Sequence, residues 1–257
     1  MKFPSEVINE IGYYVYLYID PRDESIFYVG KGKGNRVFSH LRDKSESDKI
    51  KRITEIKAQR LEPRIEILVH GIENERTALR IESSIIDLIG IKNLSNKQYG
   101  YKSRTFGRMD VHQIVATYIN EEVHVTEPSI LIRINQAFRY TMTPAELYDY
   151  TRGQWKLDPN GRASRATYAF AVYQGIVQEV YIIHNWYNAG TTFSIRKGNE
   201  NIHRGAEERV KGRYEFIGDI APASVRSKYL NKYVGHYFNR GNSNPIFFVN
   251  MEKNIME

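Results

Sequence analysis

The stretch that decides the fold of the N-terminal half is residues 13–36, YYVYLYIDPRDESIFYVGKGKGNR. It opens with alternating aromatic and aliphatic residues, which place Tyr14, Tyr16 and Tyr18 on one face of a strand. Residues 20–25 are turn formers, and the apolar run that follows them can return as an antiparallel partner. The pattern therefore predicts a β-hairpin.

A glycine-rich turn follows the second predicted strand. The glycines let the backbone approach a partner closely, and the lysines between them add positive charge. From Asn35 onward the chain is predicted to be helical, so Arg36 and His40, four residues apart, share one helix face. The glycines and lysines of this turn are Gly30, Lys31, Gly32, Lys33 and Gly34.

A carboxylate interrupts the apolar face of a second predicted helix. Segment 74–89, NERTALRIESSIIDLI, has helical periodicity, and Glu82 falls within an apolar stripe. A carboxylate that faces a core costs several kcal/mol unless it is paired or binds a metal. Glu82 is therefore either a metal ligand or the partner of a nearby arginine.

Taken together, these motifs resemble the GIY-YIG endonuclease superfamily, and more closely its LEM-3-like branch. The resemblance covers roughly residues 10–100 and includes both tyrosine motifs, the arginine-to-histidine spacing and the helical glutamate. The first motif departs from the parent family, because Tyr14-Val15-Tyr16 stands where Gly-Ile-Tyr is usual. The tyrosine itself is retained.

The resemblance implies a role for each motif residue. Glu82 would hold one Mg²⁺ or Mn²⁺ on a phosphate oxygen, and Arg36 would neutralise the pentavalent phosphorane. Tyr16, or a water that it orients, would be the general base, acidified by the metal or by the phosphate-binding lysines Lys31 and Lys33. The remaining predicted site residues are Tyr28 and His40, which would position the reactants, and a site asparagine, for which Asn96 is favoured over Asn93.

Composition agrees with a polyanionic partner. The chain has 257 residues, 37 basic and 30 acidic side chains, and therefore a formal charge of +7. The absence of cysteine excludes disulfides and cysteine-ligated zinc. We expect a soluble cytoplasmic protein with no membrane partner, because neither a signal peptide nor a long apolar run is visible.

A linker is predicted between Lys97 and Asp110, where periodicity is lost. It separates a nuclease domain, residues 1–106, from a recognition domain, residues 107–257. The second domain holds twelve arginines and six lysines. Arginine binds phosphates and guanine edges bidentately, so this bias suggests recognition, although surface ion pairs would explain it equally well.

The second half is predicted to be rich in strands. Strands are expected at 129–135, 166–173, 176–183, 213–217 and 245–249, with helices at 110–123, 143–151 and 222–238. Several strands with few helices indicate a small curved sheet or open barrel. This half resembles the PUA, EVE and SRA-like β-barrels, which cup a flipped or modified base.

That resemblance makes two tryptophans, Trp155 and Trp186, candidates to stack on a base, at about 1–3 kcal/mol per base. The alternative is that both are packing residues of the core or rim. Three arginines flank Trp155 and could hold phosphates, unless they form only a solvated cluster. They are Arg152, Arg162 and Arg165.

The sequence thus predicts an α+β protein with a GIY-YIG domain and a β-rich recognition domain. Its expected function is metal-dependent cleavage of DNA, with RNA left open, in restriction or phage defence and including modified DNA; a homodimer would allow both strands to be cut. The alternatives are a repair or junction-processing nuclease and a nucleic-acid-binding protein without catalysis.

Overall fold

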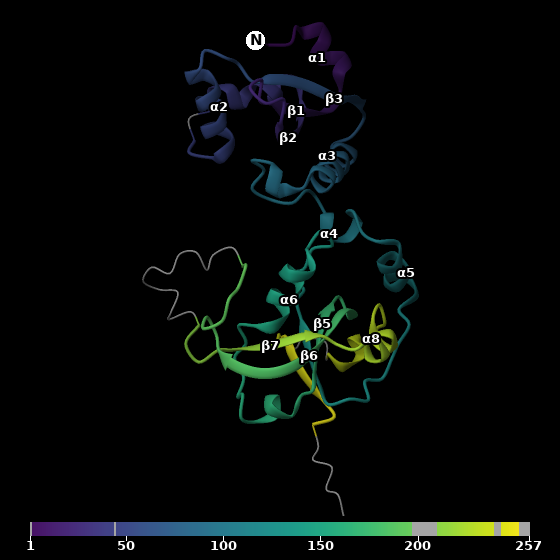
Figure 1. Ribbon diagram of the computed structural model, residues 1–257. Helices are drawn as coiled ribbons and strands as arrows, with labels where there is room; N and C mark the ends of the chain where they lie inside the picture. The colour runs from purple at the N-terminus through teal and green to yellow at the C-terminus, as the bar shows by residue number, and fades with distance from the viewer. Residues whose placement is uncertain (1, 44, 197–209, 239–242, 252–257) are drawn as a thin grey trace, which may run out of the picture. The chain divides into compact units, whose positions relative to one another are not determined.

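The computed structural model describes residues 2–43, 45–196, 210–238 and 243–251. The chain divides into two compact units, Met1–Arg108 and Met109–Glu257 (Figure 1). Each unit has its own sheet and its own apolar core, and each is described separately below.

The first unit contains a three-stranded antiparallel sheet with the strand order β2-β1-β3. The predicted hairpin is confirmed, with Tyr16 opposite Gly30 and Tyr14 opposite Gly32. The strands are β1 (Tyr13–Ile19), β2 (Ile26–Lys33) and β3 (Arg64–Ile72). The helices are α1 (Ser5–Ile11), the 3₁₀ helix η1 (Gly34–Arg42), α2 (Asp48–Ala58), α3 (Glu75–Ile89), η2 (Ile91–Asn93) and α4 (Ser103–Phe106).

Helices cover both faces of this sheet, as the alternation of β1 requires. Tyr14, Tyr16 and Tyr18 pack with the apolar side chains of η1 and α2. Val15 and Leu17 face the other way and pack with α3. The helix that carries Glu82 and the helices that follow β2 therefore lie on opposite faces of one sheet.

The second unit contains a five-stranded sheet with the order β7-β6-β5-β4-β8. Strand β4 is parallel to β5, and the other pairs are antiparallel. The strands are β4 (Ser129–Arg133), β5 (Tyr168–Tyr173), β6 (Ile176–Asn188), β7 (Tyr214–Ile220) and β8 (Ile246–Val249). The helices are α5 (Val111–Ile119), α6 (Pro144–Arg152), η3 (Arg162–Arg165), α8 (Ala223–Tyr229) and η4 (Gly235–Tyr237).

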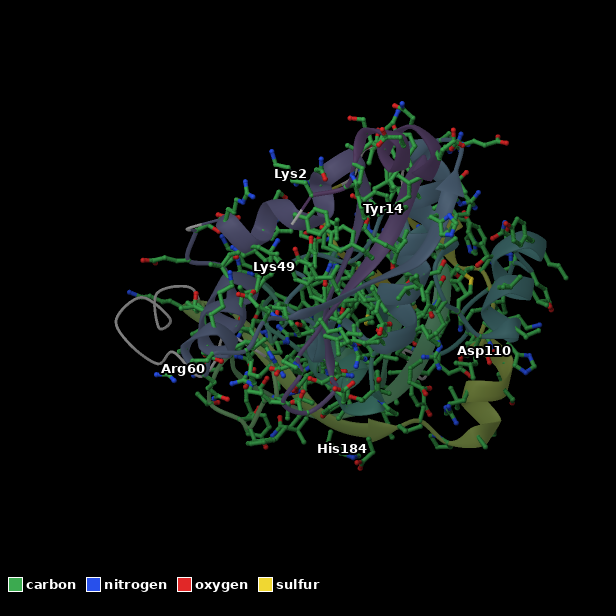
Figure 2. All side chains as sticks on the ribbon, turned by 90° about the horizontal axis from the view of Figure 1, so that it is seen from above. Lys2, Tyr14, Lys49, Arg60, Asp110 and His184 are labelled. Carbon is green, nitrogen blue, oxygen red and sulfur yellow. The ribbon has the colours of Figure 1, made fainter. Side chains whose placement is uncertain are left out.

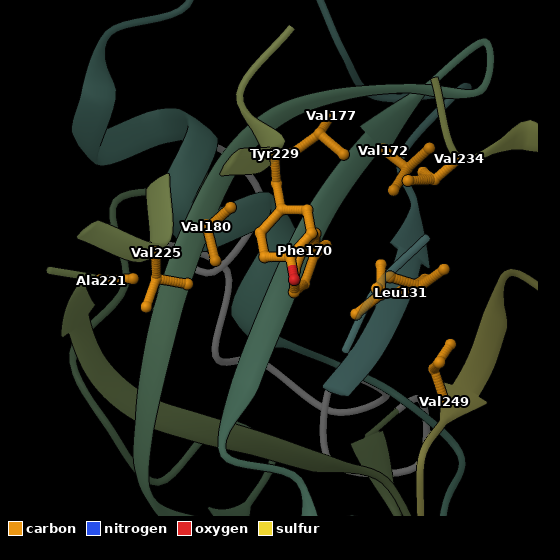
Figure 3. Packing of buried hydrophobic residues seen from close by; sticks show 11 residues of the cluster. Leu131, Phe170, Val172, Val177, Val180, Ala221, Val225, Tyr229, Val234 and Val249 are labelled. Carbon is orange, nitrogen blue, oxygen red and sulfur yellow. The ribbon is translucent and has the colours of Figure 1, made fainter. Parts of the chain in front are cut away.

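Side chains alternate between two apolar clusters on the faces of this sheet. On one face Tyr229 of α8 lies against Phe170 of β5, with ring centroids 5.0 Å apart (Figure 3). On the other face Tyr148 of α6 packs against Phe216 of β7. The α+β fold class with a β-rich second half is confirmed, whereas the likeness to PUA-like barrels stays a prediction.

One predicted helix is too long. Periodicity predicts a helix over 222–238, but α8 ends at Tyr229. The chain then turns at Asn231, which has a φ of 62°, and exchanges backbone hydrogen bonds with the start of β6: Asn231 N–H donates to Val177 O, and Val177 N–H donates to Lys232 O, both at 3.0 Å. Pairing with a strand therefore replaces the last helical turns.

Candidate functional site

The central tyrosine of β1 lies across a glycine of β2. A Cβ atom at position 30 would stand 2.7 Å from Cζ and the hydroxyl oxygen of Tyr16 and 2.8 Å from Cε1 of Tyr28. No real Cβ makes contacts this short, so Gly30 leaves room for the Tyr16 ring to cross the strand. Tyr16 is only 1% exposed.

The tyrosines on either side of Tyr16 fix the start of η1. The Tyr14 hydroxyl donates to Gly34 O at 2.6 Å and accepts from Val37 N–H at 3.1 Å. The Tyr18 hydroxyl donates to Val37 O. Since η1 carries the predicted arginine and histidine, two of the three tyrosines hold the segment that brings them to the site.

The free edge of β2 is satisfied by side chains instead of by another strand. The side chain of Asn96 accepts from Val29 N–H at 3.1 Å and donates to Val29 O at 2.8 Å. Two residues along the strand, Lys31 N–H donates to Glu82 Oε1 at 2.9 Å. Glu82 and Asn96 therefore lie side by side along the same edge. The other asparagine considered, Asn93, donates to Ile89 O on the surface.

Both site tyrosines are protonated in this environment. Burial raises the pKa of Tyr16 far above its usual 10, and Tyr28 and Tyr18 raise it further, while Arg36 lowers it. Burial also raises the pKa of Tyr28, as does Glu82, whereas a hydrogen bond from Tyr16 and the charge of Arg36 oppose the shift. Glu82 and Arg36 therefore both lie within electrostatic reach of Tyr28.

Arg36 and His40 approach these tyrosines from η1. The His40 ring meets Tyr28 edge-on, with centroids 5.5 Å apart. Burial lowers the pKa of His40 to about 4, helped by Lys49 and Arg36, so the imidazole is neutral at pH 7. Arg36 is exposed, and within the described residues its guanidinium has no ion pair. It is therefore available to an anion.

Lys31 and Lys33 lie within β2, where the sequence predicts a glycine-rich turn, and their side chains are placed differently from the prediction that they acidify Tyr16. The Lys31 ammonium pairs with Glu75, and Lys33 lies 5.0 Å from the ring centroid of Tyr13. Both project from the face opposite Tyr16, because they alternate with Gly30 and Gly32 along β2. The cation that acts on Tyr16 is Arg36.

Sequence reasoning missed Lys49, which lies at the start of α2. Its Nζ is 4.3 Å from the centroid of the Tyr28 ring, and the side chain lines a pocket of about 360 Å³ together with Tyr28, Glu82 and Asn96. Figure 2 labels Lys49 on α2 and Tyr14 on β1. The available signal was a lysine just after the helix cap Ser47, where a cation opposes the helix dipole.

The residues present suit a magnesium-type ion. Burial raises the pKa of Glu82, and the backbone N–H and the charge of Lys31 only partly offset this shift. No arginine pairs with it among the described residues. The described residues contain no group of three or more potential ligands. A single carboxylate is enough for Mg²⁺ or Mn²⁺, which keep waters and take substrate phosphate oxygens.

In the second unit, Arg152 differs from its prediction as a phosphate contact. It is only 3% exposed, and its Nε donates to Asp149 Oδ1 at 2.7 Å. Its other nitrogens bond Thr192 and the carbonyl of Phe193. Arg152 thus forms a buried structural pair and is closed to a ligand. The other two predicted arginines are exposed on η3, at positions 162 and 165.

The two tryptophans are partly buried against the core cluster of the second unit. Trp155 Nε1 donates to Thr151 O at 2.7 Å, and Trp186 Nε1 donates to Ala163 O at 3.2 Å. This packing matches the alternative reading of both residues. Trp155 additionally lines a cavity of about 470 Å³, whose wall includes Tyr150, Gln154, Arg133 and Arg196.

Comparison with known proteins supports the family. Residues 13–122 match the family model of the LEM-3-like GIY-YIG domain. A Caenorhabditis elegans protein, the Ankyrin repeat and LEM domain-containing protein 1 homolog, is 37% identical over 120 residues. That alignment covers 36% of this chain and only 17% of the relative, and no solved structure matches the chain.

The N-terminal part of the chain therefore contains a LEM-3-like GIY-YIG domain, and the resemblance noted from the sequence is confirmed. The matched segment continues past Arg108 and includes α5. No helix among the described residues is long and apolar enough to cross a membrane.

Proposed function

We propose that this protein is a metal-dependent endonuclease that hydrolyses DNA phosphodiester bonds. The observation that carries the proposal is that Glu82, bonded to the edge of β2, and Arg36 both act electrostatically on Tyr28, which interacts with Tyr16, within a domain of the matched family. Four residues with complementary roles, drawn from four elements, are hard to explain as packing alone.

In this proposal each side chain has one task. Arg36, unpaired in the described structure, neutralises the charge that builds up on the phosphorus-bound oxygens during attack. Tyr16 is protonated, so we assign it the orientation of the attacking water through its hydroxyl. Neutral His40 and Tyr28 position the phosphate and the water. Glu82 would hold a Mg²⁺ or Mn²⁺ ion, and the bound ion would supply charge stabilisation to the departing alkoxide.

We assign target selection to the second unit. Its cavity of about 470 Å³ has an aromatic wall, formed with Trp155, and polar groups such as Gln154 and Arg196. Aromatic and amide side chains together suit a base that is stacked on its face and bonded at its edge. A restriction or phage-defence nuclease that acts on DNA with a modified base would need such a site.

The test is cleavage of matched plasmids that carry cytosine, methylcytosine or hydroxymethylcytosine, in the presence of Mg²⁺ or Mn²⁺. Preferential cutting of one modified plasmid supports the full proposal. Preferential cutting of branched DNA, with no dependence on modification, would instead identify a repair or junction-processing nuclease. Binding to DNA without cutting under any of these conditions would indicate a protein without catalysis.

A further inference from the structure

Lys49 occupies a position that helix stability does not explain. It is the second residue of α2, which begins at Asp48 after the capping residue Ser47. A cation in the first helical turn opposes the macrodipole, at a cost of about 0.3–1 kcal/mol. Lys51 on the same helix is exposed, whereas Lys49 is half-buried with its ammonium over the Tyr28 ring.

No carboxylate forms an ion pair with the half-buried Lys49 ammonium among the described residues. Within the described structure only Asp43 favours its charge, while Arg36 and Lys97 oppose it. Burial, the largest influence, lowers the pKa of Lys49 to about 8. The other ionisable groups around it are His40, Tyr28, Glu82, Tyr99 and Tyr101. A cation held in this way lacks an anion in direct contact.

We propose that the Lys49 ammonium is a second phosphate-binding group of this site and that it brackets the phosphodiester together with Arg36. The inference rests on the proposed nuclease function and adds a residue to it. A phosphodiester presents two non-bridging oxygens, so one can face Arg36 and the other Lys49. Both contacts are charge-assisted hydrogen bonds.

The shape of the pocket agrees with this assignment. Lys49 shares its walls with Tyr28, Glu82 and Asn96, which lie along the β2 edge. A phosphate that contacts Lys49 therefore stands next to the carboxylate assigned to the metal. Arg36 acts electrostatically on both Tyr28 and Lys49, so its charge is felt in the same part of the site.

The first test is single-turnover DNA cleavage by the full chain at a fixed Mg²⁺ concentration. Lys49→Met keeps the aliphatic stem on Tyr28 but removes the charge, and it should slow cleavage by about 10- to 100-fold. Lys49→Arg keeps the charge and should restore the rate to within a few fold. Lys51→Met, the matched control on the same helix, should cut at the wild-type rate.

Thermal unfolding separates this role from a structural one. Lys49→Met should unfold at the wild-type temperature or slightly above, because an unfavourable cation leaves the helix N-terminus. Slow cleavage with an unchanged unfolding temperature supports the proposal. Equal cleavage rates for Lys49→Met and Lys51→Met would overturn it, and so would failure of Lys49→Arg to restore a slow Lys49→Met variant.

A second test does not require cleavage. The lysines of the full chain are ¹³C-dimethylated, which keeps their charge, and inorganic phosphate is titrated while the methyl signals are followed by NMR. The Lys49 and Lys51 signals are assigned by their absence from the spectra of Lys49→Met and Lys51→Met. In the wild-type spectrum, the Lys49 signal should move at lower phosphate concentrations than the Lys51 signal. Identical titration of both signals refutes the Lys49 assignment. Absence of cleavage by the wild-type chain would refute the nuclease function alone.

Discussion

Replacing Glu82 by glutamine and by alanine should affect catalysis equally and stability in opposite ways. Glu82 Oε1 accepts the Lys31 N–H at 2.9 Å, and burial raises the pKa of its carboxyl group. Glutamine keeps an oxygen in that place and removes a charge that burial disfavours. Alanine removes both the charge and the acceptor.

The expected magnitudes follow from these contacts. Glu82→Ala leaves the Lys31 N–H without its partner, which lowers the free energy of unfolding by about 1–2 kcal/mol. For a unit of this size, that loss lowers the melting temperature by roughly 5–10 °C. Glu82→Gln should melt at the wild-type temperature or higher. Both variants lose a charge that stabilises the transition state by several kcal/mol, so cleavage should fall by about 10³-fold or more, since 1.36 kcal/mol is a factor of ten.

The assay pairs Mg²⁺-dependent plasmid cleavage with thermal unfolding of the same preparations. DNA binding should persist in both variants, because the arginine contacts to phosphate remain. Glu55→Gln, an exposed change on α2, is the control and should alter neither property. Undiminished cutting by Glu82→Gln would refute the metal-ligand role. If Glu82→Gln melted at a temperature as low as that of Glu82→Ala, the argument that burial disfavours the Glu82 charge would be refuted.

Further predictions concern other residues and the division of the chain. Arg36→Lys keeps a charge but loses the planar guanidinium, so cleavage should fall by roughly 10²-fold; a wild-type rate would make Arg36 a simple surface cation. The pKa of His40 is about 4 when folded and near 6.5 when unfolded, so the unfolded chain binds more protons between these values, and stability should fall by up to about 3 kcal/mol as the pH drops through that window. His40→Gln should flatten this part of the pH dependence of the urea midpoint, and an unchanged profile would contradict the assignment. Trp155→Ala should weaken DNA binding by about 1–3 kcal/mol if the residue stacks on a base, whereas Trp186→Ala should lower the melting temperature without altering binding by the folded fraction. A fragment that ends at Arg108 should fold and cut weakly without preference, and failure to fold would show that its core is incomplete.

Sequence alone predicts the N-terminal sheet because its signals are local. Alternation in β1 separates the tyrosine face from the aliphatic face, and the turn formers after Ile19 set the hairpin. Glu82 is visible as a carboxylate within an apolar stripe, and the hairpin motifs identify the family. These features need only neighbours along the chain, so periodicity is enough to find them.

The features that sequence missed depend on contacts between distant segments. Lys49 and Tyr28 are 21 residues apart, and only the packing of α2 on the sheet brings them together. Arg152 looks like a surface cation in sequence because Asp149 is an ordinary helix neighbour, yet both are buried. α8 ends early because its continuation pairs with Val177, which no helical period encodes.

The glycines of β2 also restrict how the hairpin can assemble. Tyr16 stands opposite Gly30 and Tyr14 opposite Gly32, and neither glycine has space for a Cβ. A slip of one residue would bring Val29 or Lys31 opposite Tyr16, where a side chain would collide with the ring. A mispaired hairpin is therefore penalised by the rings of Tyr14 and Tyr16, so folding favours the alignment that sets these rings over the two glycines.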